Sequence, residues 1–92
     1  MFAIAFALLL HQTEASHPKS VSQAYADIGA TLNRYGFTRV QGSVYLSQDE
    51  NLVNVTRAMV ALKALSWFPI CVRDIRAFKV EHWSDFTDFV KS

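Results

Sequence analysis

Basic residues and one carboxylate lie close together between residues 72 and 79, in the segment VRDIRAFK. Its charged members are Arg73, Asp74, Arg76 and Lys79. An arginine guanidinium presents a planar set of donors that matches phosphate oxygens, and Asp74 can orient one arginine through a salt bridge. Alternating charges are also typical of an edge strand that resists pairing with another sheet. On the residues alone, this second interpretation is preferred.

A second set of hydrogen-bonding side chains recurs at every other position of FTRVQGSVYLS, residues 37–47. Residues two apart share a face of a β-strand, so we expect one polar row made of Arg39, Gln41, Ser43 and Tyr45. The positions between them are core-like. Gly42 permits a tight turn or a bulge in the middle, which predicts two short strands or one bent strand.

The N-terminal run MFAIAFALLL alternates in size with period two, which is typical of a strand covered on both faces. We expect its large residues to face helices. The small ones, Ala3, Ala5 and Ala7, are expected on a helix-free face beside the polar row. Two interpretations of that face stay open. One is a dimer interface whose polar groups bond to one another, which the pattern alone favours; the other is a site at a dimer seam that binds a phosphodiester.

Composition limits the function classes. The 92 residues suffice for one domain, 1–92, and the 51% hydrophobic content favours a second copy that covers the excess. With a net charge of +1, any RNA site must be a local patch. The first basic residue, Lys19, follows the apolar run, and the run is shorter than a membrane span, so we expect neither a signal peptide nor a membrane partner. The single cysteine, Cys71, fits a cytoplasmic location.

Periodicity and turn residues indicate the order strand, helix, strand, strand, helix, strand. Polar residues and a proline predict a loop at 11–19, and apolar residues three and four apart predict a helix at 19–35 that Gly36 ends. This order is typical of an α+β domain of the ferredoxin-like βαββαβ type. We therefore expect an antiparallel sheet with both helices on one face, followed by a short C-terminal helix.

Three local signals complete the expected organisation. The motif Ser-x-x-Glu at 47–50 predicts the start of the second helix. The segment 72–83 predicts a last long strand, with a bulge or a bend near 77–78 where its alternation changes phase. No pair of histidines has the spacing of helical metal ligands, so we expect solvated side chains at His11, His17 and His82.

Three segments resemble the virulence-associated protein D (VapD) family of bacterial toxin–antitoxin systems. They are MFAIAFALLL, YGFTRVQGSVY at 35–45 and CVRDIRAFKVEHWSDFTDFVKS at 71–92. The resemblance covers nearly the whole chain, and the family is in turn similar to the small dimeric nucleases of CRISPR spacer acquisition. It implies a ferredoxin-like homodimer that cleaves RNA, acts as a toxin and is neutralised by a cognate antitoxin protein.

One position departs from the family pattern, which runs apolar-Ala-apolar-Ala-Phe-Asp-Leu at the N-terminus, with the acid as the main candidate for the chemistry. This chain has Ala7 in that place, between Phe6 and Leu8. A methyl group cannot hold a metal ion or accept a proton, so the resemblance implies a catalytically impaired form. Either the member is naturally inactive, or the acid was replaced on purpose so that a toxic nuclease can be produced. The second origin is preferred.

If the family acid stood at position 7, the resemblance implies that two carboxylates meet near a dimer axis. They would share a divalent metal such as magnesium, or one would act as general base on water or a ribose 2′-hydroxyl. The RNA backbone would be positioned by Gln41, Ser43 and Tyr45, and its charge neutralised by Arg39, Arg73 and Arg76. The alternative is a non-catalytic dimeric module that binds RNA or an antitoxin protein.

Overall fold

The computed structural model describes all 92 residues as an α+β domain with one four-stranded antiparallel sheet and five helices. The sheet order is β2-β3-β1-β4, so β1 lies in the interior and pairs with both β3 and β4. The strands are β1 Phe2–Leu8, β2 Thr38–Gln41, β3 Val44–Ser47 and β4 Val72–Lys79. The helices are α1 Leu10–Ser16, α2 Val21–Arg34, α3 Leu52–Lys63, α4 Phe68–Cys71 and α5 Thr87–Lys91. None of them is long and apolar enough to span a membrane.

The large residues of β1 face the helices, which confirms the orientation predicted from their alternation. Ile4 and Phe6 belong to one buried cluster with apolar residues of α2 and α3, among them Ile28 and Leu62. Burying one such side chain fully stabilises the fold by about 1.5–3 kcal/mol. This helix-covered face therefore supplies most of the core.

The opposite side of the sheet, which we call the open face, is defined by the residues that pair with the alanines of β1. Ala3 pairs with Leu46 and Phe78, Ala5 with Val44 and Arg76, and Ala7 with Asp74. None of these residues belongs to the buried cluster under α2 and α3. On β1, β3 and β4 the open face is formed by Ala3, Ala5, Ala7, Val44, Leu46, Asp74, Arg76 and Phe78.

Helix α2 begins and ends near the predicted positions. Ser20 precedes it in an extended conformation and its hydroxyl accepts a hydrogen bond from the Gln23 amide at 3.0 Å, which satisfies one free donor of the first turn. Gly36 follows it with φ of 86°, the left-handed conformation in which glycine commonly ends a helix. The chain then turns directly into the β2–β3 hairpin, where Gly42 has φ of 41°.

The loop predicted at 11–19 is wrong, because α1 occupies Leu10–Ser16. Thr13 is fully buried, and its hydroxyl donates to the Leu9 carbonyl at 2.8 Å. The polar residues that suggested a loop form the exposed side of a single short amphipathic helix. His17, just after it, is also buried, so the expectation of a solvated side chain is wrong there.

Two boundary signals are placed differently from their predictions. Asn51, not Ser47, precedes α3, and its side chain accepts from the Val53 amide at 2.9 Å. Ser47 ends β3 instead, with its hydroxyl accepting from the Asp49 amide. The register of β4 is regular at 77–78, so of the predicted bulge or bend, the bulge is wrong there. The irregularity lies at the other end of the strand, opposite Ala7 and Leu8.

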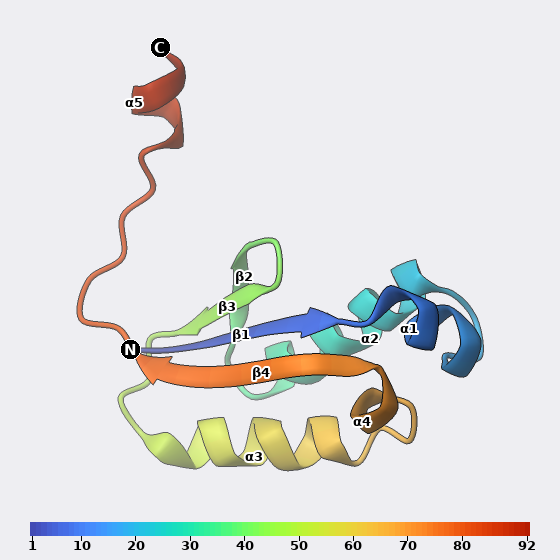
Figure 1. Cartoon of the computed structure of the whole chain (residues 1–92). Helices are drawn as coiled ribbons and strands as arrows, with labels where there is room; N and C mark the ends of the chain where they lie inside the picture. The colour runs from blue at the N-terminus through green and yellow to red at the C-terminus, as the bar shows by residue number, and fades with distance from the viewer.

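Beyond β4, residues 80–92 leave the body of the domain as an extended arm that ends in α5 (Figure 1). Its apolar side chains are largely exposed to solvent: Phe86 is 64% exposed, Phe89 77% and Val90 76%. The predicted short C-terminal helix is present. Ser84 does not cap it, because Asp85 accepts from the Thr87 amide and the Ser84 hydroxyl lies 2.8 Å from His82 Nε2.

Candidate active site

Ala7 lies at one end of the open face, where β1 continues past the end of β3. The last residue pair between these strands is Ala5 with Val44, and the Phe6 amide then donates to the Ser43 carbonyl at 3.2 Å. On its other side Ala7 pairs with Asp74 of β4. Residues directly opposite in an antiparallel pair have Cβ atoms about 4.5–5.5 Å apart. Position 7 is therefore a half-buried site flanked by a carboxylate and by the β2–β3 turn.

A β-bulge beside Ala7 explains why the consecutive residues Arg73 and Asp74 contact each other through their side chains. Leu8 pairs with Val72 and Ala7 with Asp74, so Arg73 is the additional residue on β4. A bulge redirects a side chain that would otherwise alternate to the other face. As a result the Arg73 Nε lies 3.1 Å from the Asp74 Oδ2, although the two residues are consecutive.

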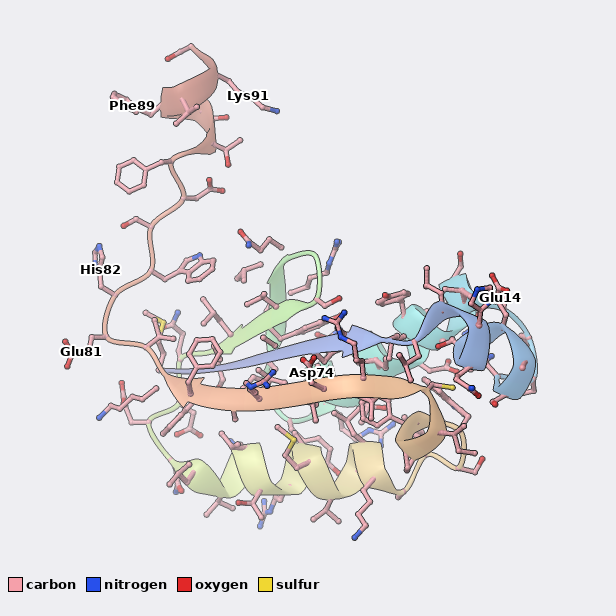
Figure 2. The ribbon with its side chains drawn as sticks, in the orientation of Figure 1. Glu14, Asp74, Glu81, His82, Phe89 and Lys91 are labelled. Atoms are coloured by element: carbon pink, nitrogen blue, oxygen red, sulfur yellow. The ribbon has the colours of Figure 1, made fainter.

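The Asp74 carboxylate is held by two arginines. Arg73 contacts Oδ2, and the Arg76 Nη1 lies 3.0 Å from Oδ1. The two arginine side chains are 64% and 73% exposed, so each ion pair is worth at most about 1 kcal/mol. Either arginine can exchange the carboxylate for a phosphate oxygen at little cost. Figure 2 shows Asp74 on the sheet, far from the arm that carries Phe89 and Lys91.

The polar row predicted along residues 39–45 does not share one face, and the prediction is wrong for three of its four members. Tyr45 is 6% exposed and packs in the main core, where it pairs with Ile4 and stacks on Phe6 with ring centroids 6.3 Å apart. Its neighbours Val44 and Leu46 lie on the open face instead. Both sets contain apolar atoms, so alternation alone could not say which set faces the helices.

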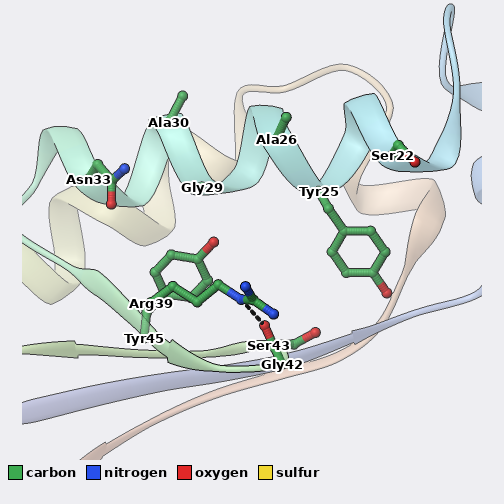
Figure 3. Close-up of a pocket in the computed structure, with 10 residues that line it drawn as sticks. All are labelled: Ser22, Tyr25, Ala26, Gly29, Ala30, Asn33, Arg39, Gly42, Ser43 and Tyr45. Atoms are coloured by element: carbon green, nitrogen blue, oxygen red, sulfur yellow. Dashed lines mark hydrogen bonds between the residues drawn. The ribbon is translucent and has the colours of Figure 1, made fainter.

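Gln41 is the member of that row whose predicted position is confirmed. The register between β2 and β3 shifts between Arg39 and Gln41, and Gln41 then pairs with Val44 on the open face. Arg39 pairs with Tyr45, so it lies on the helix-covered side. There it lines a cavity with Ser43 and residues of α2 (Figure 3). Of the eight sequence candidates, Arg73, Asp74 and Arg76 lie near Ala7, and three line this cavity. The remaining one, Gln41, lies on β2, which β3 separates from β1.

The residues around Ala7 do not fit a divalent metal ion. No three histidine, cysteine, aspartate or glutamate side chains gather anywhere in the chain. Asp74 is the carboxylate paired with Ala7, and both of its oxygens are already bound by arginines. Since Mg²⁺ is bound through carboxylates and retained water, the site as it stands is suited to a phosphate rather than to a cation.

Sequence reasoning missed a polar pair on the helix-covered side, between the buried His17 and the partly exposed Asp27. His17 Nε2 lies 2.8 Å from Asp27 Oδ2, and His17 Nδ1 accepts from the Lys19 and Ser20 amides. The ring therefore carries its proton on Nε2 and donates it to Asp27. This hydrogen bond, followed by one from the Gln23 side chain, lowers the pKa of Asp27 below its usual value. The partners are ten residues apart across a turn, a separation that no periodic pattern marks.

Known proteins similar to this chain share one name. No family profile matches the chain. "Endoribonuclease VapD homolog" of Neisseria gonorrhoeae is 59% identical over 92 residues, which is the full length of both chains. "Endoribonuclease VapD" of Haemophilus influenzae is 54% identical over the same length. "Endoribonuclease VapD" of Helicobacter pylori is 43% identical over 94 aligned positions, again covering both chains completely.

Proposed function

The chain belongs to the VapD endoribonuclease family, and on this premise we propose that it is built to bind and cleave RNA, the toxin of a toxin–antitoxin system, with its own cleavage impaired by Ala7. The observation that supports this most directly is the Arg73–Asp74–Arg76 cluster beside Ala7 on the open face. It combines exposed phosphate-binding groups with a position where one carboxylate would complete an acid–base site.

The arginine cluster supports RNA binding through the phosphate backbone. Arg73 and Arg76 are both exposed on β4, where each contacts the Asp74 carboxylate. Guanidinium groups bind phosphate oxygens in a bidentate way, and such contacts position a strand without reading its sequence. Gln41, on the same face, adds an amide that donates and accepts.

A carboxylate at position 7 would lie opposite Asp74, and like charges this close raise the pKa of one member of a pair. A carboxylate with a raised pKa is suited to accept a proton from water or from a ribose 2′-hydroxyl at neutral pH. Arg73 and Arg76 would keep the second carboxylate ionised and neutralise the phosphate. The methyl group of Ala7 can do none of this, so we infer that the chain binds RNA and cleaves it slowly or not at all.

The test is to compare this chain with Ala7→Asp on labelled single-stranded RNA. We expect the cleavage rate to rise by about 10²–10⁴-fold, the usual contribution of a positioned acid or base. Ala5→Asp is the matched control, because it adds a carboxylate two residues along the same strand and face, opposite Arg76. Equal cleavage by all three proteins, or a gain in both variants, would contradict the assigned role of position 7.

We further propose that each chain has a ferredoxin-like fold and that two chains form a homodimer through the open face. The strand order β2-β3-β1-β4 and the antiparallel pairing support that arrangement. Phe78 is 46% exposed on the open face, and the arm exposes Phe86, Phe89 and Val90. A second copy that covers these side chains would bring two position-7 sites close to one axis.

The second candidate function is a non-catalytic module that binds RNA or an antitoxin protein. The open face favours it, because its exposed Phe78 and Arg76 offer an apolar and a charged group to a partner whether or not cleavage occurs. The Ala7→Asp comparison separates the two functions. A chain that still fails to cleave after the change, while it retains a copurifying partner, fits the binding module.

A further inference from the structure

A cavity of about 800 Å³ lies between α2 and the β2–β3 hairpin, on the side of the sheet opposite to Ala7. Its volume is within the range of small-molecule sites. Helix α2 forms one wall with small residues, among them Ala26, Gly29 and Ala30, and the hairpin forms the other with Arg39, Ser43 and Tyr45. No acidic side chain lines it.

The charge of Arg39 has no partner within the protein. Its Nε donates to the Gly42 carbonyl at 2.8 Å, which fixes the guanidinium at the cavity, and it takes part in no salt bridge. Figure 3 shows the guanidinium directed toward the Gly42–Ser43 turn, with a tyrosine ring on either side in this view. The Nη groups are left free to bind an anion.

Aromatic and flat surfaces complete the cavity. Tyr25 is 37% exposed and contributes its ring from α2, with its centroid 6.2 Å from that of Phe6. At Gly29 an added Cβ would lie 2.9 Å from the Tyr45 hydroxyl, so only glycine lets the helix backbone approach this ring. A planar heterocycle can pack against such a wall, and every nucleobase can stack on an aromatic face.

We propose that this cavity binds one nucleotide unit, with the phosphate on Arg39 and the base between Tyr25 and the small-residue wall of α2. Neighbouring hydrogen-bonding groups from Ser22, Asn33 and Ser43 suit the edge of a base or a ribose. The nucleotide comes either from the RNA strand or from a free mononucleotide. The first source rests on the proposed function, and the second does not.

The position of Ser43 links the cavity to the candidate active site. Its side chain lines the cavity, while its carbonyl accepts from the Phe6 amide, next to Ala7 in the chain. An RNA strand that passes around the β2–β3 turn would reach both places. The cavity would then hold a nucleotide that flanks the phosphate bound at Arg73 and Arg76.

The test uses the intact chain, titrated with uridine 5′-monophosphate and with adenosine 5′-monophosphate while the backbone amide resonances are followed by NMR. We expect saturable shifts at Gly29, Gly42 and Ser43. Arg39→Gln keeps a side-chain donor for the Gly42 carbonyl but removes the charge, and we expect it to weaken binding at least about tenfold. The matched control is Arg57→Gln on the exposed side of α3, which should stay within about twofold.

The source of the nucleotide follows from competition. If single-stranded RNA displaces the mononucleotide, the cavity is an RNA subsite; if both bind together, it takes a free nucleotide. Absence of saturable shifts up to about 10 mM ligand, or equal losses in Arg39→Gln and Arg57→Gln, would overturn the proposal. Failure of Ala7→Asp to cleave RNA leaves these shifts unchanged, so the two proposals fail separately.

Discussion

Asp27, on the helix-covered side, and Asp74, on the open face, are both carboxylates with two side-chain partners. Asp27 accepts from His17 and Gln23, and the His17 ring is itself buried and bonded to two backbone amides. Asp74 is held by Arg73 and Arg76, whose guanidinium groups are both largely exposed to solvent. The two carboxylates are about equally exposed, at 36% and 35%, so the difference lies in their partners: the His17 side chain is 2% exposed, whereas the two arginine side chains are 64% and 73% exposed.

The difference separates the part of the sheet that stabilises the fold from the part that we propose for recognition. On the helix-covered side no buried side-chain polar atom lacks a hydrogen-bond partner, so the polar groups of the core are satisfied within the fold. On the open face the ion pairs are exposed and weak, so phosphate can replace carboxylate. The buried groups that keep the fold and the exposed arginines around Asp74 therefore lie on opposite sides of β1.

The largest expected contrast comes from truncating one phenylalanine on each side. Phe37 is 1% exposed in the main cluster, and Phe78 is 46% exposed on the open face. Phe37→Ala should lower the free energy of unfolding by about 3–5 kcal/mol. Phe78→Ala should lower it by about 1 kcal/mol, because half of its surface is already in contact with solvent. Urea unfolding at low protein concentration measures both.

Equal losses in the two variants would contradict the division of the sheet into a stabilising and a recognition side. Repeating the measurement at high protein concentration sharpens the comparison. If a second copy covers Phe78, its truncation becomes more costly as the protein associates, while the effect of Phe37→Ala stays the same.

The face that each side chain occupies could be predicted from the sequence only where the alternation of residue types along a strand fits a single orientation of that strand. The alternation in β1 is decided by size, since Phe6 and Ala7 cannot exchange faces without emptying the core. In the hairpin both sets contain groups that tolerate burial. Tyr45 buries its ring and takes the helix-covered side, and Leu46 is buried on the open face. Pairing with β1 decides which set of hairpin residues faces the helices, and the local sequence does not encode that pairing.

The bulge beside Ala7 illustrates the same limit at the site. The segment 72–79 allowed either phosphate-binding arginines or a charged edge strand, and the structure places Arg73 and Arg76 around Asp74. Arg73 reaches Asp74 because β4 has one residue more than β1 at that point, a fact of strand pairing. The charged residues were visible in the sequence, and their common orientation was not.

A smaller effect is expected from substitutions in the arm, residues 80–92. They test whether the apolar side chains of the arm belong to the dimer interface. In the doubly substituted variant Phe86→Ser with Phe89→Ser, the apolar surface of α5 is lost. Sedimentation equilibrium should show a dimer dissociation constant raised at least about 100-fold, since each buried phenylalanine contributes about 1.5–3 kcal/mol. The control is Val60→Ser on α3, also exposed at 63%. A chain that is monomeric before substitution, or a variant that dimerises equally well, would rule out the arm as part of the interface.

The smallest expected effect is the pH dependence of stability, which should differ between variants of Asp27 and of Asp74. Because hydrogen bonds from His17 and Gln23 lower the pKa of Asp27 from its usual 3.8, the native state favours the ionised form. Its contribution to stability is therefore complete above about pH 4 and is lost as pH falls through the lowered folded-state pKa. Asp27→Asn lacks this contribution, so its deficit in melting temperature should be present at about pH 6 and shrink toward about pH 2. Asp74→Asn is the comparison, because its exposed ion pairs contribute little to stability. A deficit in Asp27→Asn that stays constant with pH would show that the network stabilises through packing rather than through the charge.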